Sequence, residues 1–271
     1  MPLVIHSLAS GSSGNSILVK DDKTSLLIDA GIGIRKIVAG LEAARVNPAD
    51  LSAILVTHEH SDHIAGAVRM ARRYGVPLVA TAPTLERMDG ANDVPHKIVG
   101  AGDEISVDDL HVRAFAISHD AACPVGYTVA SNTATVCNAT DTGVLTPEIR
   151  AEAAQADLLI LESNHDVDML RTGPYPYYLK RRIMGDKGHI SNDAASALLI
   201  DLAESGSKVS VWLAHLSKTN NTPAMALVTA QYLLWTCLGT TLDIAVAQRD
   251  IPSLWWRREA YQLKFSKFNP N

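Results

Sequence analysis

Thr57-His58-Glu59-His60-Ser61-Asp62-His63 holds three of the chain's ten histidines, all between positions 58 and 63. The segment directly follows the apolar residues 53–56, which have the pattern of a buried strand. A loop at a strand end is held by a rigid scaffold, so its side chains can converge on one site. Imidazole nitrogens and carboxylate oxygens are ligands for zinc, manganese or iron. The segment therefore predicts a metal site.

The spacing within this segment allows one loop to serve two metal ions. In an extended loop, His58 and His60 point the same way because they lie two residues apart. Asp62 and His63 begin the next predicted helix and turn elsewhere. The alternative is a solvated polar loop that contains these residue types by chance.

Two metal ions need more ligands than one loop supplies, and three further residues follow other predicted strands in the same way. They are His119 after residues 112–118, Asp141 after residues 135–139, and His215 after residues 209–213. Taken singly, each has an ordinary alternative as a capped loop residue or a hydrogen-bonded histidine. Their shared position relative to their strands is what a common site requires, so we expect them to meet the 58–63 loop.

The rest of the chain alternates between short strands and helices. Strands are predicted at 3–6, 16–20, 25–29, 53–56, 77–80, 158–161, 208–213 and 242–247, and helices over 33–45, 64–74, 146–155, 191–203 and 222–238. A β-rich stretch over 97–137 carries hairpin signals at Asp108-Asp109 and Ser131-Asn132. This order predicts a single α/β domain over residues 1–271, in which the aromatic and basic extension 249–271 has no assigned place.

The composition is typical of a globular protein of the cytoplasm. Of 271 residues, 47% are hydrophobic and 20% are charged, which favours a packed core over disorder. We find neither a membrane-spanning run nor a secretion signal, and we expect no membrane contact. The scattered Cys123, Cys137 and Cys237 are expected to be reduced packing residues. The net charge of −5 argues against tight non-specific DNA binding, although two divalent cations would offset most of it.

The unbroken HxHxDH pattern of residues 58–63 resembles the metallo-β-lactamase superfamily. The resemblance implies a four-layer αββα sandwich and two divalent metal ions, Zn²⁺ or Mn²⁺ with iron also possible, without an organic cofactor. It implies one ion on His58, His60 and His119, the other on Asp62, His63 and His215, and a bridging Asp141. Asp29 matches the family's early strand-end aspartate, and together with Thr57 it is expected to orient the ligand loop from outside.

Other features divide this large superfamily. The β-lactamases themselves place a cysteine in the second metal site, where this chain has Asp141, and Cys137 is offset from that position. Flavodiiron oxygen reductases replace the second histidine of the motif with glutamate and add a flavin domain, whereas His60 is intact here. Glyoxalase II carries a helical C-terminal substrate domain, which the pattern does not show.

The segments Leu159-Ile160-Leu161-Glu162-Ser163-Asn164-His165-Asp166 and Lys187-Gly188-His189-Ile190-Ser191-Asn192 resemble the phosphodiesterase branch, which includes the tRNA-processing RNase Z family. The resemblance implies that Glu162 orients His189, and that His189 protonates the leaving oxygen. It also implies that Asp62 orients a hydroxide activated at the metals. The alternative is that His189 caps the following helix while Glu162 forms a surface pair.

Further motifs resemble the narrower YycJ/WalJ family, and this match runs from residue 7 to residue 225. They are Ser10-Gly11-Ser12-Ser13-Gly14-Asn15-Ser16, Tyr175-Pro176, Lys180-Arg181-Arg182-Ile183, and His215-Leu216-Ser217-Lys218 with Asn220-Asn221. That family is associated with DNA exonuclease activity from 5′ ends, which implies DNA as the substrate. We expect Ser12, Ser13 and Asn15 of the glycine-serine turn to contact a terminal phosphate; the alternative is that the turn needs its glycines only for steric reasons. The other expected contacts are His165, Lys180, Arg181, Arg182 and Lys218; the alternative for the basic cluster is a solvated helix face.

Two other functions stay open at this point. One is a small-molecule phosphodiesterase of the same superfamily that acts on cyclic nucleotides or phosphosugars, which the acidic balance favours. The other is a regulatory protein that keeps metal ions for structure only. The sequence leaves the identity of the metal, the polarity of digestion and the oligomeric state open.

Overall fold

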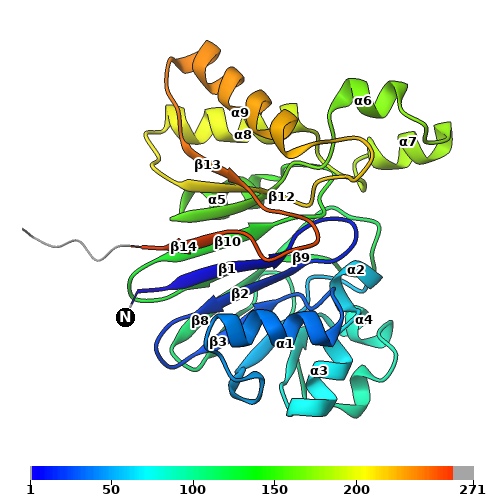
Figure 1. The fold of residues 1–271 in the computed structure, drawn as a ribbon, viewed down its shortest axis with the longest axis vertical. Coiled ribbons are helices and arrows are strands. Elements are labelled where there is room, and N and C mark those ends of the chain that lie inside the picture. Colours follow the sequence, from blue (N-terminus) through cyan, green and yellow to red (C-terminus); the bar gives the residue numbers. More distant parts are fainter. Residues whose placement is uncertain (1, 259–271) are drawn as a thin grey trace, which may run out of the picture.

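The computed structural model describes residues 2–258, which form two β-sheets of seven strands each (Figure 1). Across the first sheet the order is β14 (Trp255–Arg257), β1 (Val4–Ala9), β2 (Ser16–Lys20), β3 (Ser25–Ile28), β4 (Ala53–Leu55), β5 (Leu78–Ala80) and β6 (His96–Ile98). Across the second it is β13 (Asp243–Val246), β12 (Ser210–Ala214), β11 (Leu158–Glu162), β10 (Thr135–Ala139), β9 (Val125–Ala130), β8 (Leu110–Ala116) and β7 (Glu104–Val107).

Helices cover the outer face of each sheet, so the layers follow the order αββα (Figure 1). Beside the first sheet lie α1 (Ile34–Ala43), α2 (Ser61–Ile64), α3 (Ala67–Tyr74) and α4 (Ala82–Glu86), with short 3-10 turns at Pro48–Asp50 and Ala91–Asp93. Beside the second lie α5 (Pro147–Ala154), α6 (Val167–Thr172), α7 (Tyr177–Ile183), α8 (Asn192–Glu204) and α9 (Pro223–Leu238). The predicted four-layer sandwich is confirmed.

Strand β11 shows why the central strands are apolar at every position. All five of its residues are buried. Leu158 and Ile160 face the core between the two sheets, whereas Leu159 and Leu161 face the core under α8 and α9. Because successive side chains of a strand point to opposite faces, a strand covered on both sides reads as a continuous apolar run.

Parallel pairing brings the ends of several strands together at one edge of each sheet. In the second sheet β10, β11, β12 and β13 are all parallel, and Glu162 pairs with Ala214 in the β11–β12 register. In the first sheet β3, β4, β5 and β6 are parallel, and Ile28 pairs with Leu55. The loops that leave these carboxyl ends are therefore neighbours, as binding sites on parallel sheets require.

The helix predicted over 64–74 is wrong in its extent, because the chain forms α2 and α3 with a break at Gly66. The Gly66 N–H donates to the carbonyl of Ala30 at 2.7 Å, and a Cβ at Gly66 would lie 2.5 Å from the carbonyl oxygen of Ile32. The backbone is therefore too close to the 30–32 loop for a regular helix. The strand predicted over 112–118 also ends earlier than expected, at Ala116.

Three α-helices and one strand were not predicted at all, namely α4, α6, α7 and β14, and neither were the two 3-10 turns. Strand β14 lies in the extension that the sequence pattern did not place. It pairs antiparallel with β1, and Trp255 stacks on the ring of His6 at a centroid distance of 3.7 Å. Residues 259–271 of the same extension, with Tyr261, Phe265 and Phe268, lie outside the described residues.

The cysteines are all free thiols, but they do not share one environment. Cys137 is buried in the core of the second sheet, where burial raises the pKa of its thiol to about 12. Cys237 is exposed on α9, so the prediction that it packs is wrong. Within residues 2–258, none of the helices combines the length and the apolar character needed to cross a membrane.

Substitution of Gly31 by alanine should displace the histidine-rich loop. A Cβ at Gly31 would lie 1.6 Å from the carbonyl oxygen of Asp62, whose backbone would have to move. We expect Gly31→Ala to lower the free energy of unfolding by about 3 kcal/mol. The matched control is Gly33→Ala, because a Cβ at Gly33 would meet no atom within 4 Å. Its cost at the start of α1 should stay below about 1 kcal/mol. Equal melting temperatures for the two variants would contradict this packing argument.

Candidate metal centre

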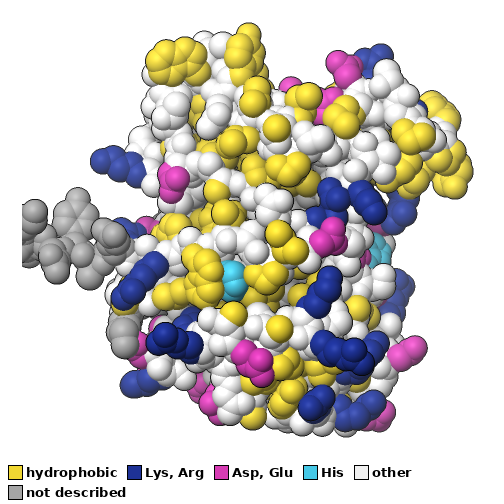
Figure 2. All heavy atoms as spheres, in the orientation of Figure 1, with side chains coloured by type: hydrophobic (Ala, Val, Ile, Leu, Met, Phe, Trp, Pro, Cys, Tyr) yellow, Lys and Arg dark blue, Asp and Glu magenta, His cyan; other side chains and the backbone are white. Residues whose placement is uncertain are grey.

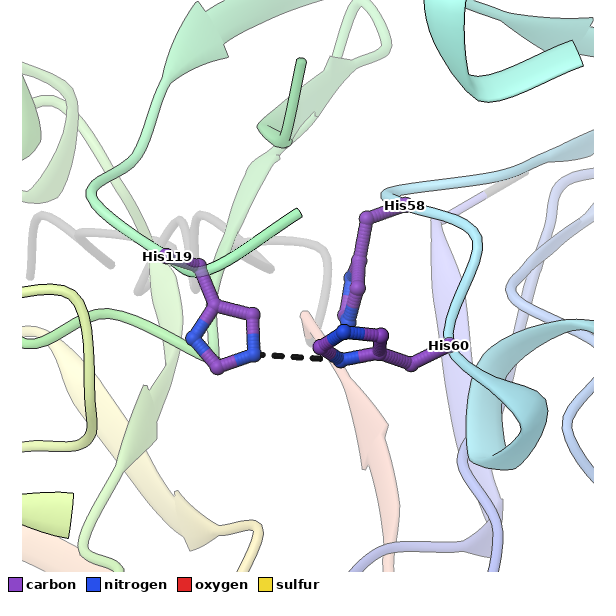
Figure 3. Close-up of side chains that lie close together, drawn as sticks. All are labelled: His58, His60 and His119. Atoms are coloured by element: carbon purple, nitrogen blue, oxygen red, sulfur yellow. Dashed lines mark hydrogen bonds between the residues drawn. The ribbon is translucent and has the colours of Figure 1, made fainter. Parts of the chain in front are cut away.

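His58, His60 and His119 form the first cluster of nitrogen ligands (Figure 3). One nitrogen of each ring lies within 4.8 Å of the others, and His119 Nε2 is 3.3 Å from His60 Nδ1. His58 and His60 come from the loop after β4, whereas His119 comes from the loop after β8. His58 Nε2 is buried and has no hydrogen-bond partner among the described residues. A buried imidazole nitrogen in this position fits a metal ion as its missing partner.

Asp62, His63 and His215 form the second cluster. Asp62 Oδ2 lies 3.6 Å from His63 Nε2 and 3.5 Å from His215 Nε2. His63 and His215 are buried, whereas the Asp62 side chain is 21% exposed. The cluster therefore offers two fixed nitrogens and one carboxylate that solvent can reach.

Asp141 lies between the two clusters. Its Oδ2 is 3.2 Å from His63 Nε2, and its Oδ1 is 3.4 Å from His215 Nε2 and 3.8 Å from His119 Nε2. The carboxylate thus contacts donors from both groups, which is the position expected of a bridging ligand.

Three residues around the centre have a left-handed backbone. Asp29 (φ 61°), Asp141 (φ 58°) and His215 (φ 54°) each follow a parallel strand, and each turns sharply. Positive φ is uncommon outside glycine and costs free energy. These turns bring the side chains back over the strand ends, where the two sheets meet.

Asp29 and Thr57 fix the orientation of His63. Asp29 Oδ2 accepts from His63 Nδ1 at 2.7 Å, and Asp29 Oδ1 accepts from the Thr57 N–H at 2.9 Å. The Thr57 hydroxyl donates to the same carboxylate. Because Nδ1 of His63 is engaged, its Nε2 faces the centre, which is how outer carboxylates commonly prepare histidine ligands.

Glu162 has the same role for two histidines of the second sheet. Its Oε1 accepts from His189 Nδ1 at 2.7 Å and from His215 Nδ1 at 2.9 Å, while Oε2 accepts from the Thr142 N–H at 2.9 Å. His119 Nδ1 lies 3.1 Å from the carbonyl of Gly188. All three rings are thus held with Nε2 available to the site.

The buried carboxylates make the centre attractive to positive charge. Burial disfavours the charged form of His63, but Asp141 and Asp29 outweigh it and raise its pKa well above the usual value. Burial also opposes protonation of His215, yet Asp141, Asp62 and Glu162 raise its pKa to about 10. Burial and the neighbouring His63 instead lower the pKa of His58 well below its usual value. Divalent cations bound at the centre would balance the negative charge of these buried carboxylates.

A pocket opens directly onto the centre. Its lining includes six residues of the two clusters and their surroundings, namely His60, Asp62, His119, Asp141, His189 and His215. Ser12, Asn164 and Ser217 line it as well, together with Tyr175, Leu179, Arg182 and Ile183 from the segment that includes α7. Of these, Asn164, Tyr175, Leu179, Ile183 and Ser217 were not predicted as site residues. Asn164 follows Glu162 at the end of β11, so its strand-end position was the available signal.

The residues expected to contact DNA do not all reach this pocket. Ser12 and Arg182 line it. The Ser13 hydroxyl donates instead to Asp250 Oδ1 at 2.8 Å. Asn15 is buried, and its Oδ1 accepts from the Gly11 N–H within the turn formed by residues 10–16. His165 is buried, and burial lowers its pKa to about 4.

The basic residues expected to contact DNA, three on α7 and one after β12, differ from one another in their contacts. Lys180 Nζ donates to the carbonyl of Arg171, Arg181 is exposed, and Lys218 is exposed beside Ser217. Arg182 Nε lies 2.6 Å from Asp120 Oδ2, and Asp120 directly follows His119. Asp120 was missed by the sequence analysis, although its position next to a predicted ligand was a usable signal. Through its contact with Arg182, Asp120 connects α7 to the loop that carries His119.

The chain is similar in sequence to proteins of known families. A family model described as "Beta-lactamase superfamily domain" matches residues 24–215. The exodeoxyribonuclease YycJ of Bacillus anthracis is 39% identical over 238 residues, which cover 86% of this chain and 90% of that protein. The exodeoxyribonuclease WalJ of Streptococcus pneumoniae is 39% identical over 247 residues, which cover 88% of this chain and 91% of that protein.

Solved structures share the fold at much lower identity. The metallo-β-lactamase fold protein YhfI from Bacillus subtilis superposes with a TM-score of 0.72 at 16% identity, covering 95% of this chain and 99% of that one. The short form of human tRNase Z superposes with a TM-score of 0.64 at 13% identity, covering 93% and 98%. At these identities the likeness concerns the fold alone.

Divalent metal ions should stabilise the protein through the two clusters. Ligands that bind only the native state add about 2.7 kcal/mol of stability at a hundredfold excess over Kd. We therefore expect Zn²⁺ or Mn²⁺ to raise the melting temperature of metal-free protein, and His58→Ala to reduce both this rise and the metal content per chain. The control is His111→Ala, because His111 is an exposed histidine of β8. If His58→Ala binds as much metal as wild type, the first cluster is not a metal site.

Proposed function

We propose that this chain, which belongs to the β-lactamase superfamily and within it to the family of the YycJ and WalJ exodeoxyribonucleases, is a metal-dependent exonuclease that hydrolyses DNA from 5′ ends. Identity of 39% to both relatives over nearly their whole length supports a shared reaction. We further propose that the centre holds two ions, one per cluster, with Asp141 between them.

The observation that carries a hydrolytic role is the His189–Glu162 pair. His189 lines the pocket, and its ring centroid is 5.0 Å from that of His119 and 5.3 Å from that of His215. Its Nδ1 is engaged by Glu162, so Nε2 is the atom left to face a substrate. A purely structural metal site has no need of a histidine prepared in this way, whereas a general acid requires it.

Divalent ions bound here would supply a nucleophile at neutral pH and balance the charge that develops on the phosphate oxygens. The chain's own residues would carry the protons. The solvent-accessible carboxylate of Asp62 would accept a hydrogen bond from the attacking water and set its direction. His189 would donate a proton from Nε2 to the 3′ oxygen as the ester bond breaks. Burial opposes the charged form of His189, but Glu162 outweighs it and raises the pKa of the ring, which favours proton donation from Nε2.

Both sheets contribute ligand residues to the same pocket, which supports the proposal that the chain acts as one domain. The free cysteines fit a reducing compartment such as the cytoplasm.

Arg182 lines the pocket and is suited to bind a phosphate group, because its guanidinium can donate two parallel hydrogen bonds.

The proposal is tested with DNA strands labelled at the 5′ or the 3′ end, incubated with protein loaded with Zn²⁺ or Mn²⁺. We expect early release of short labelled products from the 5′-labelled strand and gradual shortening of the 3′-labelled strand. Cleavage of a chromogenic phosphodiester without cleavage of DNA would favour a small-molecule phosphodiesterase. Hydrolysis of neither substrate would favour a regulatory protein.

His189→Ala should slow hydrolysis in a way that depends on the leaving group. We expect about a 10²- to 10⁴-fold loss of kcat on DNA, because the 3′ alkoxide needs a proton to depart. For bis(4-nitrophenyl) phosphate the loss should be less than about tenfold, since nitrophenolate leaves without a general acid. Metal content is measured in parallel. Equal losses on both substrates would show that His189 holds the site together and does not donate the proton.

A further inference from the structure

Helix α9 lies beside α8 on the outer side of the second sheet, and it is apolar on both of its faces (Figure 1). None of its residues is charged. The inner face packs into the core through Ala226, Ala230 and Leu234. Figure 2 shows hydrophobic side chains over this helix at the top of the molecule. The outer face carries four large apolar side chains with exposed fractions of 40%, 59%, 65% and 62%, namely Met225, Val228, Tyr232 and Trp235.

The spacing of these four residues makes one continuous stripe along α9, which we call the α9 stripe. They follow one another at intervals of three, four and three residues. At 3.6 residues per turn they fall within about 80° around the helix axis, and their centre is about 180° from that of the buried face. Apolar residues at these intervals form the seam through which one helix packs against another. The α9 stripe is therefore shaped for a second helix, which residues 2–258 do not supply.

The absence of charge limits the kinds of partner that the α9 stripe suits. The neighbouring α8 has an ordinary solvated face, because its exposed residues include Asp193, Asp201 and Glu204. Helices that lie on a membrane surface carry lysine and arginine beside their apolar face, and α9 has neither. The centres of protein interfaces, by contrast, are depleted of charged residues. An uncharged protein surface is the occupant that this chemistry favours.

The order of the side chains along the stripe suits a copy of the same helix. Positions 225 and 235 are centred on residue 230, and so are positions 228 and 232. If two α9 helices pair antiparallel, Met225 faces Trp235 of the partner subunit, and Val228 faces Tyr232 of the partner subunit. Each layer then combines one aliphatic and one aromatic side chain, and no layer has to hold two large rings. A two-fold interface requires self-complementarity of this kind.

The area of the α9 stripe is sufficient for a weak dimer. At their observed exposure the four side chains present on the order of 500 Å² per copy. Two copies would bury on the order of 1,000 Å² in total, which is the lower limit for a specific interface. The small residues beside the stripe would add to this area. We therefore expect a dissociation constant on the order of micromolar.

We propose that the α9 stripe is the interface of a homodimer, in which two copies of this chain pair through antiparallel α9 helices. The buried face of α9 keeps the helix on its own subunit, so the dimer forms between folded chains. This inference does not depend on the proposed nuclease function, because none of the four side chains lines the pocket at the metal centre.

The experiment is sedimentation velocity of the metal-loaded protein over about 1–200 μM, a range that brackets the expected dissociation constant. Wild type should shift from monomer to dimer within this range. Val228→Glu and Tyr232→Lys each place an unpaired charge in the seam, and each should weaken association at least about a hundredfold. A wild type that stays monomeric at the highest concentration overturns the proposal.

Combining the two substitutions in one chain tests the antiparallel arrangement. In that arrangement the introduced carboxylate faces the introduced ammonium of the other copy, so the double variant should associate at least about tenfold more tightly than either single variant. A parallel pair would instead place like charges opposite each other. A double variant as weak as the single variants overturns the antiparallel pair.

Ile98→Glu is the matched control, since Ile98 is an aliphatic residue of similar exposure, 58%, on β6 at the edge of the first sheet. It should associate as wild type does. Melting temperature and metal content are measured for every variant, so that a misfolded chain is recognised. If folded Val228→Glu and Tyr232→Lys dimerise as wild type does, the contact between copies lies on another face and the proposal is wrong.

Discussion

Carboxylates buried beside histidines are the constraint on which this structure depends. A buried charge is costly unless hydrogen bonds or opposite charges surround it. Asp29 meets this requirement through Thr57 and His63, and Glu162 meets it through His189 and His215. Those contacts leave Nε2 of each of these rings turned inward toward the remaining carboxylates. This arrangement suits a centre that holds cations, so the same contacts that stabilise the fold would also orient the proposed ligands.

The core of this arrangement could be predicted from the sequence because it follows from strand geometry. His119, Asp141 and His215 were expected to meet the 58–63 loop because each follows a strand, and the structure brings them together. Parallel pairing makes that inference work for Asp141 and His215, since the ends of β10 and β12 share an edge of the second sheet. His119 follows β8, which is antiparallel to β9 as β9 is to β10, so β8 runs in the direction of β10 and ends at the same edge. The role of Glu162 came from a resemblance alone. Its two-histidine contact depends on the register of β11 and β12, which local periodicity does not contain.

What the sequence missed lies in contacts between distant segments and in elements without a buried face. Ser13 and Asp250 are 237 positions apart, so a local sequence pattern cannot predict their hydrogen bond. Helix α7 has no buried residue, so it lacks the apolar periodicity by which helices are predicted. The break at Gly66 is set by the approach of the 30–32 loop, an effect of tertiary packing that overrides a helical pattern. Each of these features lies at or near the site, where local preference and global structure most often disagree.

The distribution of the donors along the chain has a consequence for how the protein matures. His58, His60, Asp62 and His63 leave the ribosome early, but His215 follows them only after most of the chain has been made. A preformed metal site rarely exists in an unfolded chain. On the proposed ligand assignment, the early loop supplies only part of the ligands, and the centre is complete only after the second sheet has folded against the first. On the ligand assignment proposed above, metal loading would be a late step of biogenesis, and bound ions would join two halves of the chain synthesised at different times.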